Sequence, residues 1–293
     1  MTNNKKINVI ILNFNNSKDT LLLVNDLILQ KNVDLNIIIV DNCSTDNSYQ
    51  ILRESIKHDK IKLIKSGTNG GYASGNNYGL RSLDQDNNNY IAILNPDIQI
   101  IDQLLFFNLV QRYESLDNVG FISPASINEK GVINQYCAKK LPTYFDEILS
   151  SFLIFSKLIA KKNRYNFQNS PKNLSVEILS GSFLFSKFDF FYHIGFFDEG
   201  TFLFCEERIL YEKISKANKK NYLICDLNIK HFASTTIGAI YTNIDQIKIF
   251  HKSLLYYTEN YLFLGRAKAL LLYPFLKFMI FQMKIINILK SIK

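Results

Sequence analysis

The first hundred residues alternate between short apolar runs and segments whose apolar residues recur at helical spacing. Apolar, β-branched runs are typical of buried strands, and four such runs occupy residues 7–12, 35–40, 61–65 and 90–94. Helical spacing follows Ser17 and recurs over 47–58 and 73–83. This alternation predicts an α/β fold: a Rossmann-like, mostly parallel sheet with flanking helices.

The pattern beyond residue 100 is less regular. Strands are expected at 118–126, 131–136, 221–226 and 228–232, and 176–187 is either a strand pair or one long strand that contains Gly181. Helical spacing predicts helices over 145–162, from Glu206, and from Asn243 to the end of the chain. The sheet is therefore expected to continue past its first four strands and to be followed by a C-terminal helical tail.

Polar clusters close the four predicted strands of the first hundred residues. They read NFNN, DNCSTD, SGTNGG and NPD. In sheets of this kind, ligands bind beyond the carboxyl ends of the strands. A single polar loop needs no further explanation, because loops face solvent. Four of them at the same edge of one sheet outline a binding site.

The NPD motif places Asp97 just beyond the strand predicted at 90–94. Proline and aspartate are ordinary turn formers, so a turn explains Asp97 when the motif is taken alone. Turn and capping roles also account for Asp41 and Asp46, which precede the helix predicted at 47–58, and we assign Asp46 to its cap. These motifs alone do not distinguish turn and capping roles from ligand binding, so the other motifs of the chain are needed.

The composition is that of a folded protein with an excess of positive charge. The 293 residues are 47% hydrophobic and carry a net charge of +8, which suggests a polyanionic partner or an anionic surface. A nucleic-acid-binding protein would need clustered Arg and Lys with exposed aromatic residues. The basic residues here are dispersed outside the tail, so we expect no nucleic-acid partner.

Cysteine usage and the amino terminus indicate a reducing, cytoplasmic setting. The four cysteines show no C-x-x-C spacing and are too scattered to predict a disulfide framework. The apolar run after the basic start is bounded by Asn8 and Asn13, and it is shorter than a signal peptide requires. We therefore expect a cytoplasmic protein without a signal peptide.

Six motifs, in their order along the chain, resemble family 2 glycosyltransferases of the GT-A fold. They read VIILNFNN, VDNCSTD, NGGYASGNNYGL, LNPD, IGFFDEGTFLFCEE and KHFASTT. The match is most similar to the rhamnosyltransferase-like branch of bacterial polysaccharide biosynthesis and covers roughly residues 7–236. It implies a GT-A domain over 1–236, with a nucleotide-binding half of about 1–100 and an acceptor half of about 101–236. A C-terminal helical region over 237–293 follows.

The resemblance implies that five residues line the nucleotide-sugar pocket: Asn13, Asp41, Asn69, Asn77 and Asn95. Asp41 would accept a hydrogen bond from a pyrimidine N3–H. The glycines of NGGYASGNN permit close approach of the backbone to a ligand beside a helix start. Asn95 would help to hold the ribose or the loop rather than the metal.

The resemblance also implies a divalent cation, Mg²⁺ or Mn²⁺, as cofactor. N-P-D stands where other glycosyltransferases carry D-x-D, so Asp97 is the expected metal ligand. Hard cations with oxygen ligands suit a diphosphate leaving group. A histidine at the position of His231 can join the cation site in this family, although a lone histidine at a strand end is more often structural.

Glu206 and Glu207 are the expected catalytic residues. A charged first helical turn alone would account for them, because the helix dipole favours acids there. The family carries an E-D-x-D-like motif at this place, whose acid deprotonates the acceptor. This alignment makes Glu207 the favoured general base and leaves Glu206 as the other candidate. The later Asp of the motif falls on Ile209, so the chain departs from the family pattern there.

The segment 266–293 contains six basic residues and no acidic one. Its longest uncharged stretch, 269–276, is too short for a simple membrane span, and Pro274 is expected to kink the helix. A helix packed on the catalytic domain is one interpretation. We favour a basic, apolar segment that lies at an anionic membrane surface.

Together these features predict an inverting, metal-dependent glycosyltransferase. It would move a sugar from a UDP- or dTDP-sugar to a hydroxyl of a growing, lipid-linked cell-surface glycan such as capsule or O-antigen. We expect it to be peripheral on the inner face of the cytoplasmic membrane. A sugar nucleotidyltransferase would need a Gly-rich, basic phosphate loop, which ILNFNNSKDT lacks. A catalytically inactive, glycosyltransferase-like scaffold stays open because of Ile209.

Overall fold

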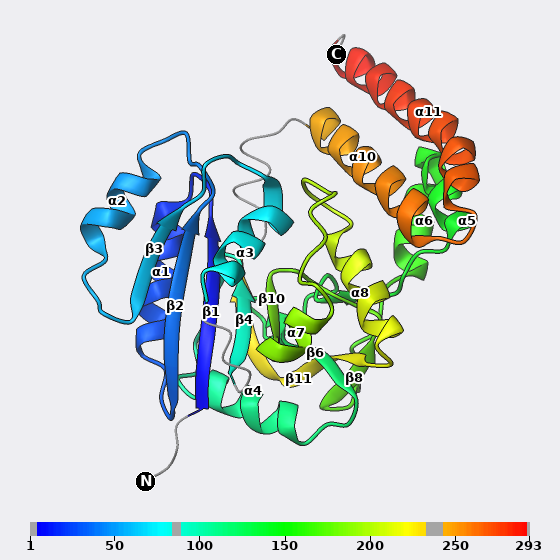
Figure 1. The fold of residues 1–293 in the computed structure, drawn as a ribbon. Helices are drawn as coiled ribbons and strands as arrows, with labels where there is room; N and C mark the ends of the chain where they lie inside the picture. The colour runs from blue at the N-terminus through cyan, green and yellow to red at the C-terminus, as the bar shows by residue number, and fades with distance from the viewer. Residues whose placement is uncertain (1–4, 84–88, 233–242, 292–293) are drawn as a thin grey trace.

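A mixed sheet of nine strands forms the centre of the molecule (Figure 1). The computed structural model describes residues 5–83, 89–232 and 243–291. The strands of the sheet are β1 (Lys5–Asn13), β2 (Val33–Asp41), β3 (Ile61–Lys65), β4 (Tyr90–Leu94), β5 (Ile98–Gln99), β6 (Val119–Ile127), β8 (Asn173–Val176), β10 (Phe183–Lys187) and β11 (Lys220–His231). They lie in the order β3-β2-β1-β4-β10-β6-β11-β5, and β8 pairs with β11 outside this path. A separate two-stranded sheet joins β7 (Ala138–Lys139) and β9 (Ile178–Leu179).

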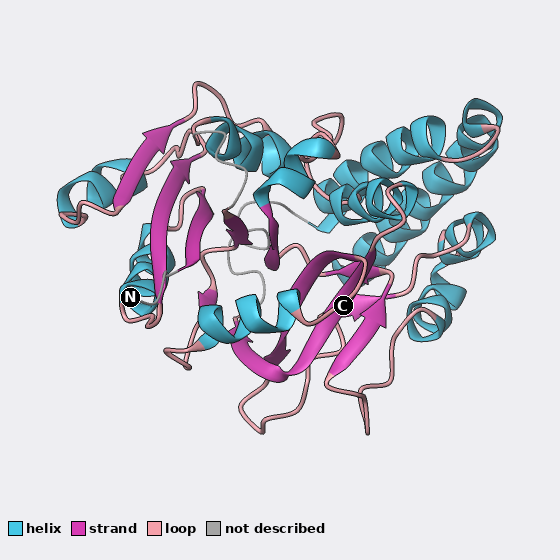
Figure 2. Cartoon of the chain, turned by 60° about the horizontal axis from the view of Figure 1, so that its bottom comes forward, coloured by secondary structure: helices cyan, strands magenta, loops and turns pink. Residues whose placement is uncertain are grey.

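Helices cover both faces of the large sheet. The helices of the described residues are α1 (Ser17–Ile28), α2 (Ser48–Ser55), α3 (Gly71–Arg81), α4 (Leu105–Glu114), α5 (Tyr144–Ser150), α6 (Leu153–Lys162), α7 (Phe188–His193), α8 (Glu206–Lys216), α10 (Asn243–Tyr261) and α11 (Gly265–Ser291), and the last two do not cover the sheet. The two faces follow from the period of two along a strand. In β1, Ile7, Val9 and Ile11 lie in a core with α1, α2 and α4, whereas Ile10 lies in a second core with α3, α7 and α8. Figure 2 shows the helices on either side of the strands.

The predicted α/β fold class is confirmed, and the first four strands and three helices lie where the apolar pattern placed them. The N-cap of α2 is Asn47, whose side chain makes no capping hydrogen bond, so the cap assigned to Asp46 lies one residue too early. The Asp46 carboxylate still accepts a hydrogen bond from the backbone N–H of Ser48, the first residue of α2, at 2.9 Å. The motif KHFASTT is described only through residue 232, so its last four residues and the boundary at 236 lie outside the described residues.

Four expectations for the less regular part of the chain were wrong in detail. No strand forms over 131–136, where Ile133 makes a single bridge to β6. The helix expected over 145–162 is interrupted between α5 and α6, and the two strands expected over 221–232 form the single strand β11, with a register shift inside it. The helix expected from Asn243 breaks before α11, where Leu264 has a φ of 55°. These interruptions depend on tertiary packing, which the apolar pattern of a short sequence segment does not reveal.

The strands β3, β2, β1 and β4 are parallel, so their carboxyl ends share one edge of the sheet, at the top in Figure 1. Strand β10 is antiparallel to β4, and its first residue, Phe183, pairs with Leu94 at that same edge. The end of β11 pairs with β5, which places His231 opposite Ile98. Segments far apart in sequence therefore converge where the polar clusters lie.

The last two helices, α10 and α11, form a hairpin that packs on α5 and α8 (Figure 1). Its contact with α8 is a closed apolar cluster of Cys205, Ile209, Leu254, Tyr257, Leu272 and Leu276. Ile209, the position where the family motif would carry an acid, is 1% exposed inside this cluster. The departure from the motif thus has a physical reason: the side chain docks the C-terminal hairpin.

Candidate active site

Asn13 and Asp41 form a buried polar pair at the ends of β1 and β2. The parallel register places the two residues side by side, and both are 0% exposed. The Asn13 amide donates to Asp41 Oδ2 at 2.9 Å, and Ser44 donates to the same carboxylate from its backbone N–H at 3.1 Å and from its hydroxyl at 2.6 Å. Thr20 donates to Asn13 Oδ1 and fixes the amide orientation. These contacts hold the carboxylate in one orientation at the floor of the strand-end cluster.

The loop before α3 lies against the same strand ends. The Asn42 amide donates to Asn69 Oδ1 at 3.0 Å and to the carbonyl of Gly71 at 3.1 Å. Gly71 has a φ of +84°, and a Cβ there would lie 1.8 Å from the carbonyl oxygen of Phe202. Only glycine fits this position, and its neighbour Tyr72 donates a backbone hydrogen bond to Phe202 at 2.9 Å. The loop therefore joins Asn69 to the segment that leads into α8.

Asn77 lies in α3, and its side chain contacts the loop over residues 197–199 rather than the strand ends. Its amide donates to the carbonyl of Phe197 at 3.0 Å and to Glu199 Oε1 at 2.8 Å, and its Oδ1 accepts from the backbone N–H of Phe197. Arg81 holds the same Glu199 carboxylate. The structure thus uses Asn77 to fasten α3 to the 197–199 loop and does not bring it together with Asn13, Asp41 and Asn69.

The turn over residues 180–182, before β10, connects the remaining parts of the site. Asn95 donates its backbone N–H to the carbonyl of Ser182 at 2.9 Å. The Tyr72 hydroxyl donates to the carbonyl of Gly181 at 2.6 Å, and the backbone N–H of Gly181 donates to Glu207 Oε1 at 2.7 Å. The start of α3, the NPD motif and the acid pair of α8 consequently meet at this turn.

Asp97 and His231 lie together because β5 pairs with the end of β11. Phe232 donates its backbone N–H to the carbonyl of Asp97 at 3.0 Å, and His231 Nε2 lies 3.2 Å from Asp97 Oδ1. Asp97 is 8% exposed. A carboxylate oxygen and an imidazole nitrogen are donors that suit Mg²⁺ or Mn²⁺, so the pair fits one side of a cation site. Within residues 5–83, 89–232 and 243–291, no group of three His, Cys, Asp or Glu side chains that could hold a metal ion is gathered.

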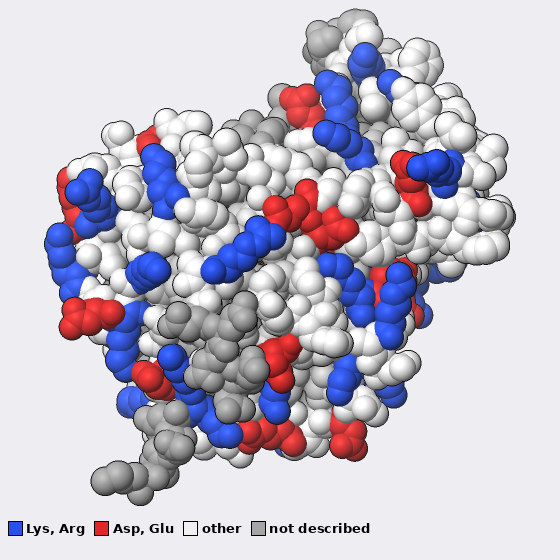
Figure 3. All heavy atoms as spheres, viewed as in Figure 1, with Lys and Arg blue, Asp and Glu red and all other residues white. Residues whose placement is uncertain are grey.

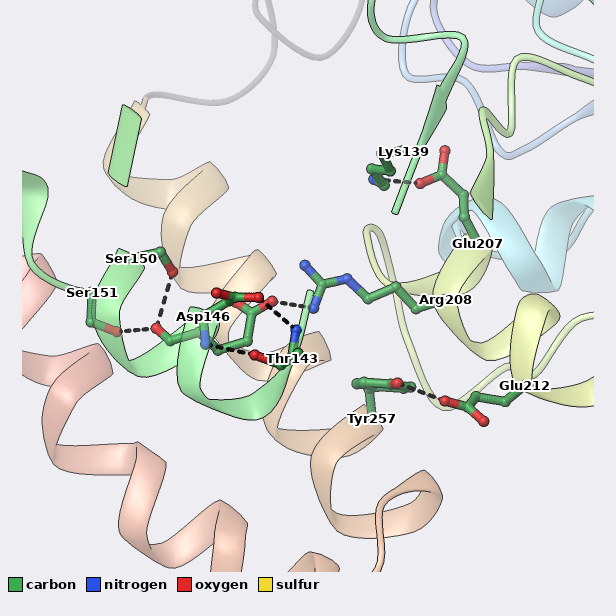
Figure 4. Close-up of polar contacts among 10 residues, drawn as sticks. Lys139, Thr143, Asp146, Ser150, Ser151, Glu207, Arg208, Glu212 and Tyr257 are labelled. Atoms are coloured by element: carbon green, nitrogen blue, oxygen red, sulfur yellow. Dashed lines mark hydrogen bonds and ion pairs between the residues drawn. The ribbon is translucent and has the colours of Figure 1, made fainter. Parts of the chain in front are cut away.

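Glu206 and Glu207 open helix α8 but lie in different surroundings. Glu207 Oε2 accepts from the ammonium of Lys139 at 3.0 Å, and Figure 4 shows the two side chains facing each other. Burial would raise the pKa of Glu207, but Lys139 and the N–H of Gly181 outweigh that effect and lower the pKa below its usual range. Glu207 is therefore ionised at neutral pH.

Glu206 has the opposite electrostatic situation. It is 9% exposed, and among the described residues its Oε2 has no hydrogen-bond partner. Burial, and then repulsion by Glu207, raise its pKa to about 8. The charges of both glutamates, added to burial, also raise the pKa of Tyr72, whose ring lies beside them. The pair therefore combines one carboxylate and one carboxyl group that keeps its proton near neutral pH.

Arg208 points away from the acid pair and joins α8 to α5 and α10. Its guanidinium donates to Glu147 of α5 at 2.6 Å, and each of these side chains is 9% exposed (Figure 4). The ring of Phe250 from α10 lies 5.6 Å from the guanidinium carbon. A buried, hydrogen-bonded ion pair with an aromatic cover fixes the start of α8 relative to α5 and α10.

Comparison with known proteins identifies the family. The model described as glycosyl transferase family 2 matches residues 8–179, which is more than half of the chain. The chain belongs to glycosyl transferase family 2. The match ends before the acid pair and before His231, so the roles of these residues in this family 2 chain rest on the geometry above and on the motif resemblance.

Two curated relatives are similar to this family 2 chain. The low-salt glycan biosynthesis hexosyltransferase Agl10 of Haloferax volcanii is 29% identical over 203 residues, which cover 69% of this chain and 59% of the relative. The rhamnosyltransferase WbbL of Escherichia coli is 26% identical over 155 residues, which cover 52% of this chain and 54% of the relative. The chain spans somewhat more than half the length of these relatives.

Solved structures share the fold of this family 2 chain at low sequence identity. A mannosyltransferase from Pyrobaculum calidifontis, in complex with GDP-Man and Mn²⁺, has a TM-score of 0.59 and 13% identity, covering 93% of this chain and 70% of that one. GalNAc-T7, with UDP, GalNAc and Mn²⁺, has a TM-score of 0.58 and 14% identity, and the match covers 87% of this chain and 51% of that one. S. aureus TarS in complex with UDP has a TM-score of 0.52 and 16% identity, covering 92% and 70%. At these identities the likeness establishes the fold.

The sequence had indicated most of the site residues but not the ones that connect them. Lys139, Gly181 and Tyr72 had no expected role, although each contacts another part of the site. A glycine inside a predicted strand was a signal, because such glycines mark a bulge or close backbone approach. Lys139 carried no local signal, since its position depends on the short pairing of β7 with β9.

Proposed function

We propose that the chain is an inverting transferase that moves a sugar from a UDP- or dTDP-sugar to an acceptor hydroxyl of a cell-surface glycan. The observation that carries this proposal is the turn at 180–182. Gly181 contacts both the start of α3 and Glu207, and Ser182 contacts the NPD motif. An ionised base thereby lies beside the strand ends at which α/β sheets bind nucleotides.

The names of the similar proteins support the same class of substrate. The two curated relatives are named a hexosyltransferase and a rhamnosyltransferase. The solved structures of the same fold hold GDP-Man or UDP, two of them with Mn²⁺. We infer a nucleotide-sugar donor and assign the chain to the rhamnosyltransferase-like branch of polysaccharide biosynthesis.

Glu207 is the proposed general base. Its Oε atom takes the proton of the acceptor hydroxyl while the acceptor oxygen forms a bond to the anomeric carbon from the face opposite the leaving group. The bond between that carbon and the phosphate oxygen breaks, and the nucleoside diphosphate leaves with the electron pair. One displacement of this kind inverts the anomeric centre. The Lys139 contact and the Gly181 N–H keep Glu207 ionised before the reaction.

Glu206 has a supporting role in this scheme. Its raised pKa keeps a proton on the carboxyl group near neutral pH, so the first turn of α8 does not hold two adjacent negative charges. A protonated carboxyl can donate a hydrogen bond to an acceptor oxygen while Glu207 accepts one. If the roles are exchanged, Glu206 is the base and Glu207 the orienting group, and substitution of each glutamate by glutamine separates these cases.

The nucleotide is proposed to lie over Asn13, Asp41, Asn69 and Asn95. A carboxylate accepts about four hydrogen bonds, and the three donated to Asp41 by Asn13 and Ser44 leave capacity for a pyrimidine N3–H. Asp97 and His231 would hold the cation. A bound Mg²⁺ or Mn²⁺ would supply charge stabilisation for the departing diphosphate.

We also propose that the chain works at the inner face of the cytoplasmic membrane on a lipid-linked acceptor. By length and composition alone, 265–289 in α11 could cross a bilayer, contrary to the expectation drawn from its longest uncharged stretch. In its apolar 18-residue window, 17% of the residues are buried. Its inner side, however, packs through Leu272 and Leu276 on α10 and α8. Its outer side exposes large apolar residues, including Leu270 at 76% and Phe281 at 57%. We propose that the helix keeps its packed side and lies on the membrane surface.

A panel of nucleotide sugars tests the proposed activity. Purified protein is incubated with UDP-, dTDP- and GDP-sugars, with Mn²⁺, Mg²⁺ or EDTA, and release of the nucleoside diphosphate is measured. We expect metal-dependent hydrolysis of one UDP- or dTDP-sugar and none with EDTA. Binding of a nucleotide sugar without turnover, with a polyprenyl-linked acceptor present, would instead establish the inactive scaffold.

A further inference from the structure

A cationic groove lies between the two helices of the C-terminal hairpin. Lys248, His251 and Lys252 line it from α10, and Lys277 lines it from α11. Its floor is apolar, with Leu276 and other aliphatic side chains, and its volume is about 240 Å³. That is smaller than the roughly 300–1,000 Å³ of pockets that enclose drug-sized ligands, so the groove is suited to a single small headgroup.

His251 lies in this groove with its polar atoms unused. The side chain is 5% exposed, and among the described residues neither ring nitrogen has a hydrogen-bond partner. A buried polar group without a partner destabilises the fold. Apolar residues would fill the same space without that cost, so the histidine indicates a ligand that hydrogen-bonds to the ring when it is bound.

The charges around the groove favour an anion. Lys248 lies 3.2 Å from Asp245, and Lys277 lies over the ring of Tyr273. Within the described part of the chain, no carboxylate lies within ion-pair distance of Lys252 or Lys277. On the face seen in Figure 3, positive side chains lie over α10 and α11, with a few negative ones beside them. Ammonium groups and an imidazole N–H are donors that a phosphate can accept together.

The neighbouring surface specifies what carries the phosphate. The outer side of α11 exposes apolar residues along most of its length, among them Leu271, Phe278, Ile285 and Leu289. An anion that reaches the groove beside such a surface would be attached to an apolar body. We propose that the groove between α10 and α11 binds the phosphate headgroup of an anionic phospholipid in the bilayer. This inference rests on the proposed surface attachment and adds a defined lipid site to it.

The groove is linked to the candidate active site through α10. Phe250, the residue before His251, packs on Arg208 and Phe204 at the start of α8. A lipid held between α10 and α11 would therefore fix the hairpin that supports the acid pair. The site would orient the enzyme on the membrane, rather than simply attract it there.

Vesicle flotation with matched charge variants tests the site. Vesicles of phosphatidylcholine alone, with phosphatidylglycerol, or with a sulfolipid of equal charge are compared. Lys252→Gln/Lys277→Gln removes two groove cations, whereas Lys268→Gln/Lys284→Gln removes two cations of the chain that do not line the groove. Each cation near an anionic surface contributes roughly 1 kcal/mol, about fivefold in affinity, so both pairs lose the general attraction. We expect the groove pair to lose at least about fivefold more affinity for phosphatidylglycerol than the control pair.

The variant His251→Phe separates binding from packing. Because the ring has no partner in the described structure, we expect the melting temperature to stay unchanged or rise, while the preference for phosphatidylglycerol over sulfolipid falls. Loss of stability with the preference intact would mean a packing role and would overturn the site. If the two lysine pairs have equal effects, or if sulfolipid and phosphatidylglycerol vesicles bind equally, the attraction is non-specific electrostatics and the proposed phosphate site is wrong.

Two further measurements identify the source of the phosphate. If inorganic phosphate or glycerol phosphate protects the groove lysines from acetylation as well as vesicles do, the ligand is a soluble anion and the lipid proposal is wrong. If only a polyprenyl diphosphate protects them, the groove holds the acceptor and the phospholipid assignment is likewise wrong. Nucleotide-sugar hydrolysis is measured on all variants, so failure of the transferase proposal is recorded separately from failure of lipid binding.

Discussion

Lys139 and Glu207 lie 3.0 Å apart across the entrance to α8, although 68 residues separate them along the chain. The pairing of β7 with β9 brings Lys139 to this place. The contact decides which of two adjacent glutamates carries the negative charge, because only Glu207 has both a cation and a backbone N–H as partners.

Lys139→Met should shift the acidic limb of the pH–rate profile to higher pH. The ammonium lowers the pKa of Glu207, so without it the base stays protonated to a higher pH. Since the lysine side chain is 46% exposed, the shift should be at most roughly one pH unit. Lys140→Met is the matched control, because Lys140 lies over the ring of Tyr165 and not at Glu207. An unchanged profile in Lys139→Met would mean that Glu207 is not the titrating base.

Glu207→Gln should retain nucleotide-sugar affinity but lose on the order of 10²–10⁴ in turnover, because the amide cannot take the acceptor proton. Glu206→Gln should lose much less, since glutamine can still donate a hydrogen bond in place of the protonated carboxyl. Calorimetry with donor and single-turnover transfer measure the two effects. The reverse order of losses would assign the base to Glu206.

Glu206→Gln should raise stability, and more so at pH 8 than at pH 4. The pKa of Glu206 is raised from 4.5 to about 8 in the folded state. The unfolded chain therefore releases this proton at lower pH than the folded chain, so wild-type stability falls as pH rises from about 4.5 to about 8. Glutamine removes that loss. Thermal unfolding of both proteins at the two pH values measures it, and a pH-independent difference would contradict the buried, protonated carboxyl.

Asp97→Asn should abolish the tightening of UDP or dTDP binding by Mn²⁺. The carboxylate and the His231 ring, 3.2 Å apart, are the donors assigned to the cation. Calorimetric titrations with Mn²⁺ and with EDTA measure the difference. Asp46→Asn is the control of equal chemistry, because the Asp46 carboxylate contacts the backbone N–H of Ser48 at the start of α2 and not the cation site. If Mn²⁺ tightens nucleotide binding equally in wild type and Asp97→Asn, the metal role of Asp97 is excluded.

Leu270→Gln/Phe281→Gln should release the protein from anionic vesicles even at low salt. Both side chains are exposed on α11, so their replacement removes apolar insertion without opening the packed side of the helix. Leu22→Gln/Leu29→Gln changes two residues of similar exposure at α1, on the other side of the molecule (Figure 1), and should float like wild type. If both variants float to the same extent, the exposed side of α11 is not the surface that attaches the protein to vesicles.

The strands and the order of the first helices could be predicted from sequence because their apolar periodicity is local. The rotation of a helix about its own axis could not be predicted in this way. Asn77 follows a glycine-rich loop in a way that resembles a nucleotide site, yet α3 turns its amide toward Phe197. Which face of α3 meets the 197–199 loop depends on packing between segments 120 residues apart.

The Asp97–His231 pair shows a similar limit. Each residue could be identified from a motif, but their proximity depends on the two-residue pairing of β5 with β11. Such short pairings have too little periodicity to predict. The interruptions between α5 and α6 and between α10 and α11 have the same origin, since the apolar patterns continue through both.

Two successive residues before the acid pair, Phe204 and Cys205, adopt left-handed backbone with φ of 69° and 66°. Non-glycine residues in this region cost about 1–2 kcal/mol each, so the loop is held under tension. Helix α10 restrains it: Ser253 donates to the carbonyl of Leu203 at 2.7 Å, and Phe250 packs on Phe204. The C-terminal hairpin thus holds a strained loop in place. A chain shortened before α10 should therefore lose the proposed transfer activity together with the proposed attachment to a membrane surface.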